Sequence, residues 1–311
     1  MLTGLSGAGR IDGSKSSADE AVRRRRSQAF MEQNQPSRTA QGAAMHRAAH
    51  QLVDRPPVFD DPLALKIIGE EAETELREGR DVRAMTTSNG LRAFIATRSR
   101  FAEDCLAEAM ARGVGQYVLL GAGLDTFAYR AIRKGLRVFE VDHPATQAWK
   151  RARLSEIRIA PPDWVTYAPV DFERETIREG LARAGFDFAS PAMFAWLGVV
   201  PYLTREAVTG TLAFVASLAK GSEIVFDYAQ TPGKESTEQR AHFDAMAERV
   251  AASGEPFRSF FEADALLCDV KALGFSFAEN LNAAALNARY FQGRDDGLAL
   301  RGRGHLMHAR V

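Results

Sequence analysis

A glycine-rich turn follows a run of apolar residues in the segment QYVLLGAGLDTFAYR, residues 116–130. Gly121 and Gly123 permit a tight turn and a close approach of the backbone to a ligand, as in the nucleotide-binding turns that follow the first strand of many α/β proteins. The dinucleotide fingerprint also requires a small third residue, whereas Thr126 stands at that position. The turn therefore departs from the pattern of NAD-binding proteins.

Asp125 lies inside the same turn. A pyrophosphate would meet this carboxylate at the N-terminus of the next helix, where anions are otherwise stabilised, and the like charges would repel. S-adenosylmethionine (SAM) has no phosphate and carries an ammonium and a sulfonium group, so an acidic side chain is tolerable or favourable there. The turn therefore suits SAM better than NAD. Two roles for Asp125 stay open, namely direct contact with the ligand and capping of the following helix.

Further acids end the next two apolar runs. The run LRVFEVD closes with Glu140 and Asp142, and Asp142, about 20 residues after the turn, is the candidate for binding both ribose hydroxyls. The run ending in PVDF offers Asp171 to the adenine amino group and Phe172 to the face of the adenine ring. Asp125, Asp142 and Asp171 thus follow three successive predicted strands, and they are expected to lie at one edge of a sheet.

One cationic side chain lies on the apolar stripe of a predicted helix. The segment LRAFIATRSRFAEDCLAEAMARG, residues 91–113, has helical apolar periodicity and ends at a glycine. Arg98 falls within this stripe, and an arginine buried without an anion is destabilising. Its partner is either a carboxylate of the protein or the carboxylate of a bound SAM, which a guanidinium can bind through two hydrogen bonds.

Strand-like and helix-like segments alternate after residue 115, which predicts a mostly parallel seven-stranded sheet with helices on both faces. The seven β-rich runs are QYVLLGAG, LRVFEVD, WVTYAPVDF, AMFAWLGVV, SEIVFDYA, FSFAENL and GHLMHARV. Between the fourth and fifth runs, residues 205–221 show the apolar periodicity of a helix that ends at Gly221. The fold class is therefore α/β.

The rest of the chain is expected to surround this core. Residues 1–35, with the basic run Arg23–Arg26, are expected to form a flexible tail, and residues 36–311 a single domain. Within the domain, residues 36–115 are expected to form a helical cap, which includes a helix starting after Ser37 and a short helix after Pro62. Residues of about 229–265, with the helical stretch TEQRAHFDAMAERVAAS, are expected to form a lid.

Composition excludes several classes of protein. Forty basic and forty acidic residues balance among 311, so no global charge attracts nucleic acid or a membrane surface. Cys105 and Cys268 lie far apart without metal-ligand spacing, which predicts core packing for both and neither a disulfide framework nor a metal site. Without an apolar run of membrane-spanning length, the chain is expected to be cytoplasmic. Its oligomeric state is not indicated.

Several motifs together resemble the SAM-dependent methyltransferases of the leucine carboxyl methyltransferase superfamily, in the bacterial branch of polyketide O-methyltransferases. The matching stretches are LLGAGLDTFAYR, FEVDHP, APVDF and WLGVVPYLT, with FDDPLA and ATRSR upstream. The resemblance covers residues 38–311 and implies the Rossmann-like class I methyltransferase fold.

The resemblance also implies roles for individual residues. Arg98 would bind the methionyl carboxylate, Gly121 and Gly123 would line the cofactor, Asp142 would bind the ribose, and Asp171 with Phe172 would flank the adenine. The sequence departs from the family at two positions, because Phe127 stands where many members have an arginine and Leu197 where many have a glutamate near the cofactor's amino end.

The expected reaction is an in-line attack of an acceptor on the methyl group of SAM, helped by alignment and by aromatic faces near the sulfonium. Tyr129, Tyr202 and Tyr228 are candidates for the acceptor pocket, whereas Trp196 suits core packing. No general base is assigned, although Asp227 and Tyr228 end the fifth predicted strand and His242 lies in the predicted lid. The predicted function is O-methylation of a hydroxyl or carboxyl of a small metabolite such as a polyketide. The alternatives are a non-catalytic ligand sensor or scaffold and, third, an NAD oxidoreductase.

Overall fold

The computed structural model describes residues 37–79, 89–130, 134–172, 174–233, 245, 247–248 and 256–311. Residues Ser37–Val311 form one compact unit, and only this unit is described. The predicted tail, residues 1–35, and most of the predicted lid, including His242, lie outside the described residues. None of the described helices is both long and apolar enough to cross a bilayer.

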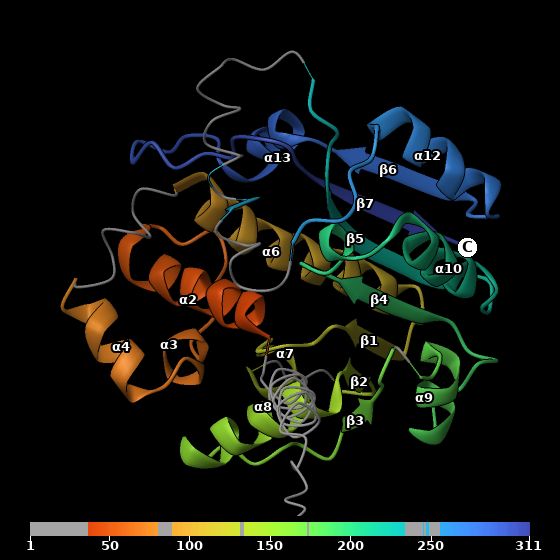
Figure 1. Ribbon diagram of the computed structural model, residues 1–311, viewed down its shortest axis with the longest axis horizontal. Coiled ribbons are helices and arrows are strands. Elements are labelled where there is room, and N and C mark those ends of the chain that lie inside the picture. The colour runs from red at the N-terminus through yellow and green to blue at the C-terminus, as the bar shows by residue number, and fades with distance from the viewer. Residues whose placement is uncertain are drawn as a thin grey trace, which may run out of the picture. The chain divides into compact units, whose positions relative to one another are not determined.

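The core is a seven-stranded sheet with the order β3-β2-β1-β4-β5-β7-β6 (Figure 1). Its strands are β1 (Gln116–Leu120), β2 (Arg137–Asp142), β3 (Val165–Pro169), β4 (Ala192–Trp196), β5 (Glu223–Ala229), β6 (Phe277–Leu281) and β7 (Gly304–Arg310). Strands β1 to β5 are parallel, whereas β7 is antiparallel to both β5 and β6. The predicted mostly parallel sheet of seven strands is confirmed.

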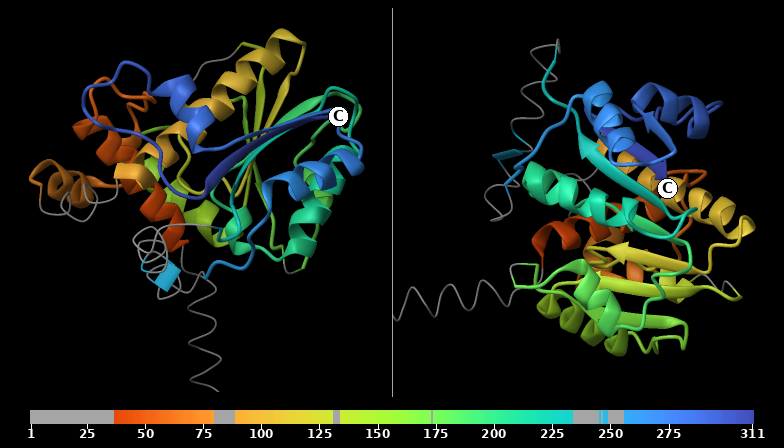
Figure 2. Two further views of the ribbon diagram at one scale, coloured as in Figure 1. Left: turned by 90° about the horizontal axis from the view of Figure 1, so that it is seen from above. Right: turned by 90° about the vertical axis from the view of Figure 1, so that its right-hand side faces the viewer.

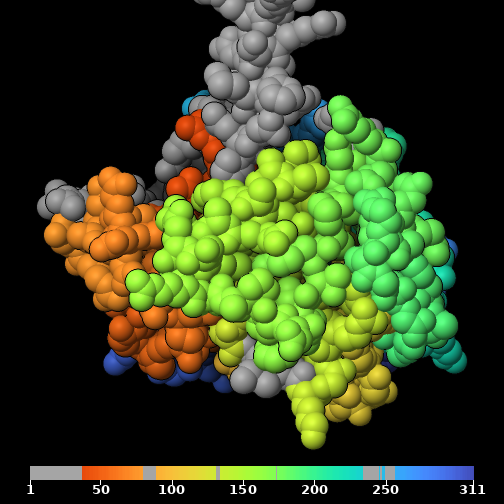
Figure 3. All heavy atoms as spheres, turned by 90° about the horizontal axis from the view of Figure 1, so that it is seen from below, coloured from red at the N-terminus to blue at the C-terminus, as the bar shows by residue number. Residues whose placement is uncertain are grey.

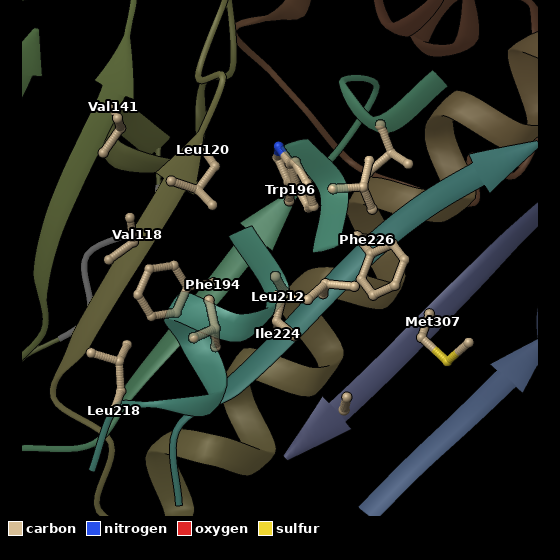
Figure 4. Close-up of a cluster of buried hydrophobic side chains, with 14 of the residues drawn as sticks. Val118, Leu120, Val141, Phe194, Trp196, Leu212, Leu218, Ile224, Phe226 and Met307 are labelled. Carbon is tan, nitrogen blue, oxygen red and sulfur yellow. The ribbon is translucent and has the colours of Figure 1, made fainter. Parts of the chain in front are cut away.

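Helices cover both faces of the sheet, as predicted (Figure 2). One face packs against α9 (Ile177–Arg183), α10 (Arg205–Ala216) and α12 (Ala263–Ala272), and the other against α6 (Asn89–Ala111), α7 (Phe127–Arg130) and α13 (Ala283–Tyr290). Figure 4 shows the first of these cores, in which Trp196, Phe226 and Met307 are all at most 3% exposed. Each large apolar side chain buried in this way stabilises the fold by about 1.5–3 kcal/mol.

A helical cap precedes the sheet in sequence. It contains α2 (Arg38–Val53), α3 (Ala64–Ile67) and α4 (Glu70–Arg77), whereas α6, which also lies within the predicted cap of residues 36–115, packs on the sheet. The N-cap of α2 is Ser37, as predicted, because its Oγ accepts a hydrogen bond of 3.1 Å from the N–H of Ala40. Apolar side chains of the cap form a cluster with Leu124, after β1, and with Leu154 of α8 (Pro144–Glu156). Figure 3 shows α8, in yellow-green, beside the orange cap segments.

The two cysteines differ in their surroundings. Cys105 of α6 is buried, as predicted, and its Sγ lies 3.8 Å from Nδ1 of His308. Cys268 is exposed, so the prediction of core packing is wrong for it. The reason is helical geometry, because α12 turns Leu266 and Val270 toward the sheet and Cys268, midway between them, outward.

A buried ion pair joins the cap to α6. The carboxylate of Asp54 accepts two hydrogen bonds of 2.8 Å from Arg92 and lies 2.7 Å from Nδ1 of His50. Burial alone would raise the pKa of Asp54, but the hydrogen bonds and charges of Arg92 and His50 outweigh burial and lower this pKa to about 2. The folded protein therefore favours the ionised form of Asp54 more than the unfolded chain does.

We expect Asp54→Asn to lower the free energy of unfolding at pH 7 by about 3 kcal/mol, because Arg92 is left buried without its counter-charge. The pKa of Asp54 is lower in the folded state, so wild type loses this contribution as the pH falls from 3.8 to about 2. Urea unfolding of both proteins over this pH range measures the effect. A difference in stability that persists unchanged at the acid end would contradict the linkage.

Candidate active site

The glycine turn after β1 is tied to the neighbouring strand by its backbone. The N–H groups of Gly121 and Ala122 both donate to the carbonyl of Val141, at 2.8 and 3.1 Å. Gly121 has φ +69°, a left-handed conformation that other residues adopt only with strain, and a Cβ on it would lie 2.5 Å from Val199. The turn therefore requires glycine both for its shape and for its packing against the segment after β4.

Asp142, the predicted ribose-binding residue, lies directly against this turn. Its Oδ2 accepts a 2.6 Å hydrogen bond from the N–H of Gly123, and its Oδ1 accepts one of 2.7 Å from the N–H of His143. Burial raises the pKa of Asp142 in spite of these two hydrogen bonds. Each carboxylate oxygen has a second lone pair, so the group can also accept hydrogen bonds from a ligand.

Glu140, two residues earlier on β2, has a different role. It is fully buried, and its Oε1 lies 2.9 Å from Nζ of Lys150 on α8. The pairing of Glu140 inside the protein leaves Asp142 as the acid at the end of the strand.

Arg98, the predicted ligand for the methionyl carboxylate, reaches the ends of β4 and β5. Its Nη1 donates a 2.9 Å hydrogen bond to Oδ2 of Asp227, and Oδ1 of Asp227 accepts from the N–H of Gly198. The guanidinium packs on the backbone of Gly198, where a Cβ would lie 2.6 Å from Nη2. The structural ion pair foreseen for Arg98 is thus present.

The ion pair with Asp227 uses only part of the hydrogen-bonding capacity of the Arg98 guanidinium. Within the described part of the chain, Nη1 is the only guanidinium nitrogen of Arg98 with a hydrogen-bond partner, although the side chain is only 13% exposed. A guanidinium has five N–H donors in one plane. It can therefore bind Asp227 on one side and a ligand carboxylate on the other, and the second contact stays a prediction.

Asp125 caps the short helix that follows the turn. Its Oδ1 accepts a 2.7 Å hydrogen bond from the N–H of Phe127, the first residue of α7. Of the two roles left open for Asp125, capping is therefore present in the structure. Direct contact with a ligand stays a prediction.

Asp171 and Phe172 follow β3, on the far side of β2 from the turn. The Asp171 carboxylate lies 3.4 Å from Nε of Arg174. Phe172 is 52% exposed, which is rare for a large apolar side chain and leaves the aromatic ring accessible. The parallel register of β1, β2 and β3 puts Phe172 at the same edge of the sheet as Asp142.

The three candidate pocket tyrosines have different neighbours. The hydroxyl of Tyr129 lies 2.8 Å from the hydroxyl of Tyr167 on β3, whereas the ring of Tyr202 packs 5.4 Å from that of Phe257. Tyr228 is 1% exposed, and its hydroxyl donates to Oδ1 of Asn280 at 2.9 Å. Tyr202, in the 3₁₀ helix η1 (Val200–Tyr202), follows the carboxyl end of β4, and both Tyr202 and Tyr129 are partly exposed.

Sequence reasoning missed a buried acid next to the turn. Asp61, between α2 and α3, is 1% exposed and accepts a 2.7 Å hydrogen bond from the hydroxyl of Thr126. Arg47 of α2 contacts both Asp61 and the turn. The available signal was the motif FDDPLA, which the resemblance included but to which no role was given.

Comparisons with known proteins define the class. A crystal structure from Thermobifida fusca YX, described as a "putative methyltransferase", matches with a TM-score of 0.55 and 18% sequence identity, over 89% of this chain and 95% of that one. The fold is thus the Rossmann-like α/β fold of methyltransferases. The model of the leucine carboxyl methyltransferase family matches residues 40–216. The chain belongs to this family.

Relatives identify the cofactor. "Putative S-adenosyl-L-methionine-dependent methyltransferase YktD" of Bacillus subtilis (strain 168) is 30% identical over 302 residues, which are 90% of this chain and 99% of the relative. A relative with the same kind of name, from Frankia alni, is 35% identical over 220 residues, 69% of this chain and 74% of its own length. The protein is a SAM-dependent methyltransferase. The predicted enzyme class and cofactor are confirmed, which sets aside the scaffold and NAD alternatives.

The residues at the edge of the sheet fit SAM. Arg98 has N–H groups without a partner among the described residues, Asp142 has lone pairs for hydroxyl groups, and Phe172 has an exposed ring. These are a cation, an acceptor and a planar apolar surface, which match the carboxylate, ribose and adenine of SAM. The assignment of each residue to its group stays a prediction.

We expect Arg98→Ala and Asp142→Ala each to raise the Kd of SAM at least about tenfold, because a hydrogen bond to a charged group contributes about 1.5–3 kcal/mol. Calorimetric titration measures the affinity. Arg100→Ala is the matched control, since Arg100 is on the same helix but its ion pair with Asp104 lies on the exposed side. Unchanged affinity in both site variants would refute the assignment.

Proposed function

We propose that the enzyme transfers the methyl group of SAM to an oxygen atom, a hydroxyl or a carboxyl, of a small metabolite, with polyketides as the first class to test. The family to which the chain belongs is described by transfer to a carboxyl group, which is an oxygen acceptor. This description supports an oxygen nucleophile over nitrogen or sulfur.

One structural observation supports a small, apolar acceptor. The segment from Leu197 to Leu203, after β4, contacts the glycine turn through Val199 and carries Tyr202 three residues later. The ring of Tyr202 packs against Phe257, and the backbone of Arg258 donates a 2.7 Å hydrogen bond to Pro201. An apolar and aromatic surface thus adjoins the turn. Such a surface suits a planar organic acceptor.

The proposed binding mode follows the order of the strands. Across the sheet, β3, β2, β1, β4 and β5 are neighbours in that order. Their carboxyl ends carry, in turn, Phe172, Asp142, the glycine turn, Gly198 and the Asp227–Arg98 pair. The groups of SAM follow the same order, from adenine through ribose and sulfur to the methionyl carboxylate.

When bound, SAM supplies a methyl group that is electrophilic because it is attached to a sulfonium. The residues of the chain hold and align the reactants. Arg98 and Asp142 hold the methionyl carboxylate and the ribose of the cofactor, and alignment of this kind is worth effective molarities of about 10⁵ M or more. Leu197 and Tyr202 give the transfer site apolar surroundings, which favour a step in which opposite charges are neutralised.

We expect label from methyl-labelled SAM to appear in a small-molecule product when phenols and carboxylic acids are offered as acceptors. Mild alkali separates the two outcomes, because it releases methanol from an ester but leaves an ether intact. Asp142→Ala, with weakened SAM binding, is the control for enzyme-dependent label. Transfer confined to nitrogen or sulfur acceptors would contradict the proposal.

The dependence of kcat on pH distinguishes a carboxyl acceptor from a phenol acceptor independently of product analysis. Carboxylic acids have pKa values near 4 and are ionised at neutral pH, whereas phenols have pKa values near 10 and need a base. With a carboxylic acid acceptor we expect kcat to be flat from about pH 6 to 9. With a phenol we expect kcat to rise with pH over the same interval. A flat profile with a phenol would contradict rate-limiting loss of its proton.

A further inference from the structure

The cap is bonded directly to the glycine turn through a buried carboxylate. Asp61 is 1% exposed, and its Oδ2 accepts hydrogen bonds from the hydroxyl of Thr126 at 2.7 Å and from Nε of Arg47 at 3.2 Å. Its Oδ1 accepts from the N–H of Leu63 at 3.2 Å. One side chain thus connects the cap to the last residue of the turn.

Arg47 makes a second connection. Its Nη2 donates a 2.5 Å hydrogen bond to the carbonyl of Leu124 in the middle of the turn, while its Nε binds Asp61. Arg47 is 7% exposed, so its charge depends on Asp61 for compensation. If Asp61 loses its charge, Arg47 loses both its counter-ion and the hydrogen bond that orients it toward Leu124.

The hydroxyl of Thr126 is held from both sides. It donates to Asp61 and accepts a 3.1 Å hydrogen bond from Nε of Arg130 in α7. Arg130 also lies 3.6 Å from Oδ1 of Asp61 and pairs with Glu103 of α6. The cap, α6 and the turn are therefore joined by a network of two acids and two arginines, whose formal charges cancel. Its members are Asp61, Glu103, Arg47 and Arg130.

We propose that Asp61 is a positioning residue that acts through Arg47 and Thr126 to hold the turn from Gly121 to Thr126 in the shape that binds SAM. The inference rests on the assignment of this turn to the cofactor. The opposite side of the turn is held by Asp142, whose Oδ2 accepts from the N–H of Gly123. Fixed from both sides, the turn presents its backbone in a single conformation, and binding then costs less conformational entropy.

The cap supplies a matched control in Asp54. Like Asp61, Asp54 is a buried aspartate, 3% exposed, and its carboxylate is bound by a buried arginine, Arg92. Its partners, Arg92 and His50, have no hydrogen bond to the turn among the described residues. Asp54→Asn and Asp61→Asn therefore each remove one buried negative charge. Only Asp61→Asn alters side chains that are hydrogen-bonded to the turn.

The test is calorimetric titration of the full chain with SAM and with its demethylated product S-adenosylhomocysteine, together with urea unfolding. We expect Asp61→Asn to raise both Kd values at least about tenfold and Asp54→Asn to leave both within about twofold of wild type, at comparable losses of stability. Equal weakening in the two variants, or wild-type affinity in Asp61→Asn, would overturn the positioning role. Neither ligand contains the acceptor, so these outcomes do not depend on which oxygen is methylated.

Thr126 keeps the proposal testable if Asp61→Asn does not fold. Thr126→Val is nearly isosteric, leaves every charge in place and removes only the hydroxyl, so we expect the Kd of SAM to rise about threefold to tenfold. Thr126→Ser retains the hydroxyl and should restore affinity to within about twofold of wild type. Wild-type affinity in Thr126→Val would overturn the inference. Failure of wild type itself to bind SAM would instead refute the cofactor assignment.

Discussion

The organisation of the site depends on one constraint, which is that an acidic side chain removed from water must be matched by cations or N–H groups. Asp61, Asp227 and Glu140 are at most 3% exposed. Each is met by a cation from another element: Arg47 from α2, Arg98 from α6 and Lys150 from α8. These helices are therefore fixed to the carboxyl edge of the sheet by charge as well as by apolar packing.

The same constraint explains how Arg98 can bind Asp227 and, in the proposed binding mode, also the carboxylate of SAM. A free guanidinium at this depth would be destabilising before any ligand arrived, so Asp227 keeps it in place and compensates its charge. Asp227 in turn is oriented by the N–H of Gly198, whose φ of +74° points that group at the carboxylate and whose missing Cβ leaves room for the guanidinium. The ion pair with Asp227 and the packing on Gly198 therefore hold the guanidinium of Arg98 at the carboxyl ends of β4 and β5.

The strands were predictable because each is a short apolar run between turn residues, and all seven runs contain an observed strand. The start of α2 at Ser37 was predictable because an N-cap is a local pattern. The contacts of Asp61 were not predictable in this way, since its partners Arg47 and Thr126 lie 14 and 65 residues away. The neighbours of the three candidate tyrosines are also a tertiary property, because they come from other parts of the chain.

The proposed alignment of SAM along the site follows from the topology of the sheet. In the chain, the strands run from β1 to β5, but in the sheet β3 and β2 precede β1, and β4 and β5 follow it. The two acids at the ends of β2 and β3 therefore lie on one side of the glycine turn and the cationic Arg98 on the other. With its nucleoside end toward β2 and β3, SAM directs its hydroxyl and amino donors to the two acids and its carboxylate to Arg98. The reverse orientation would lose both kinds of contact. In the proposed binding mode, the strand order sets which end of the cofactor faces β5. It thereby also sets the proposed position of the transferred methyl group beside the apolar segment after β4.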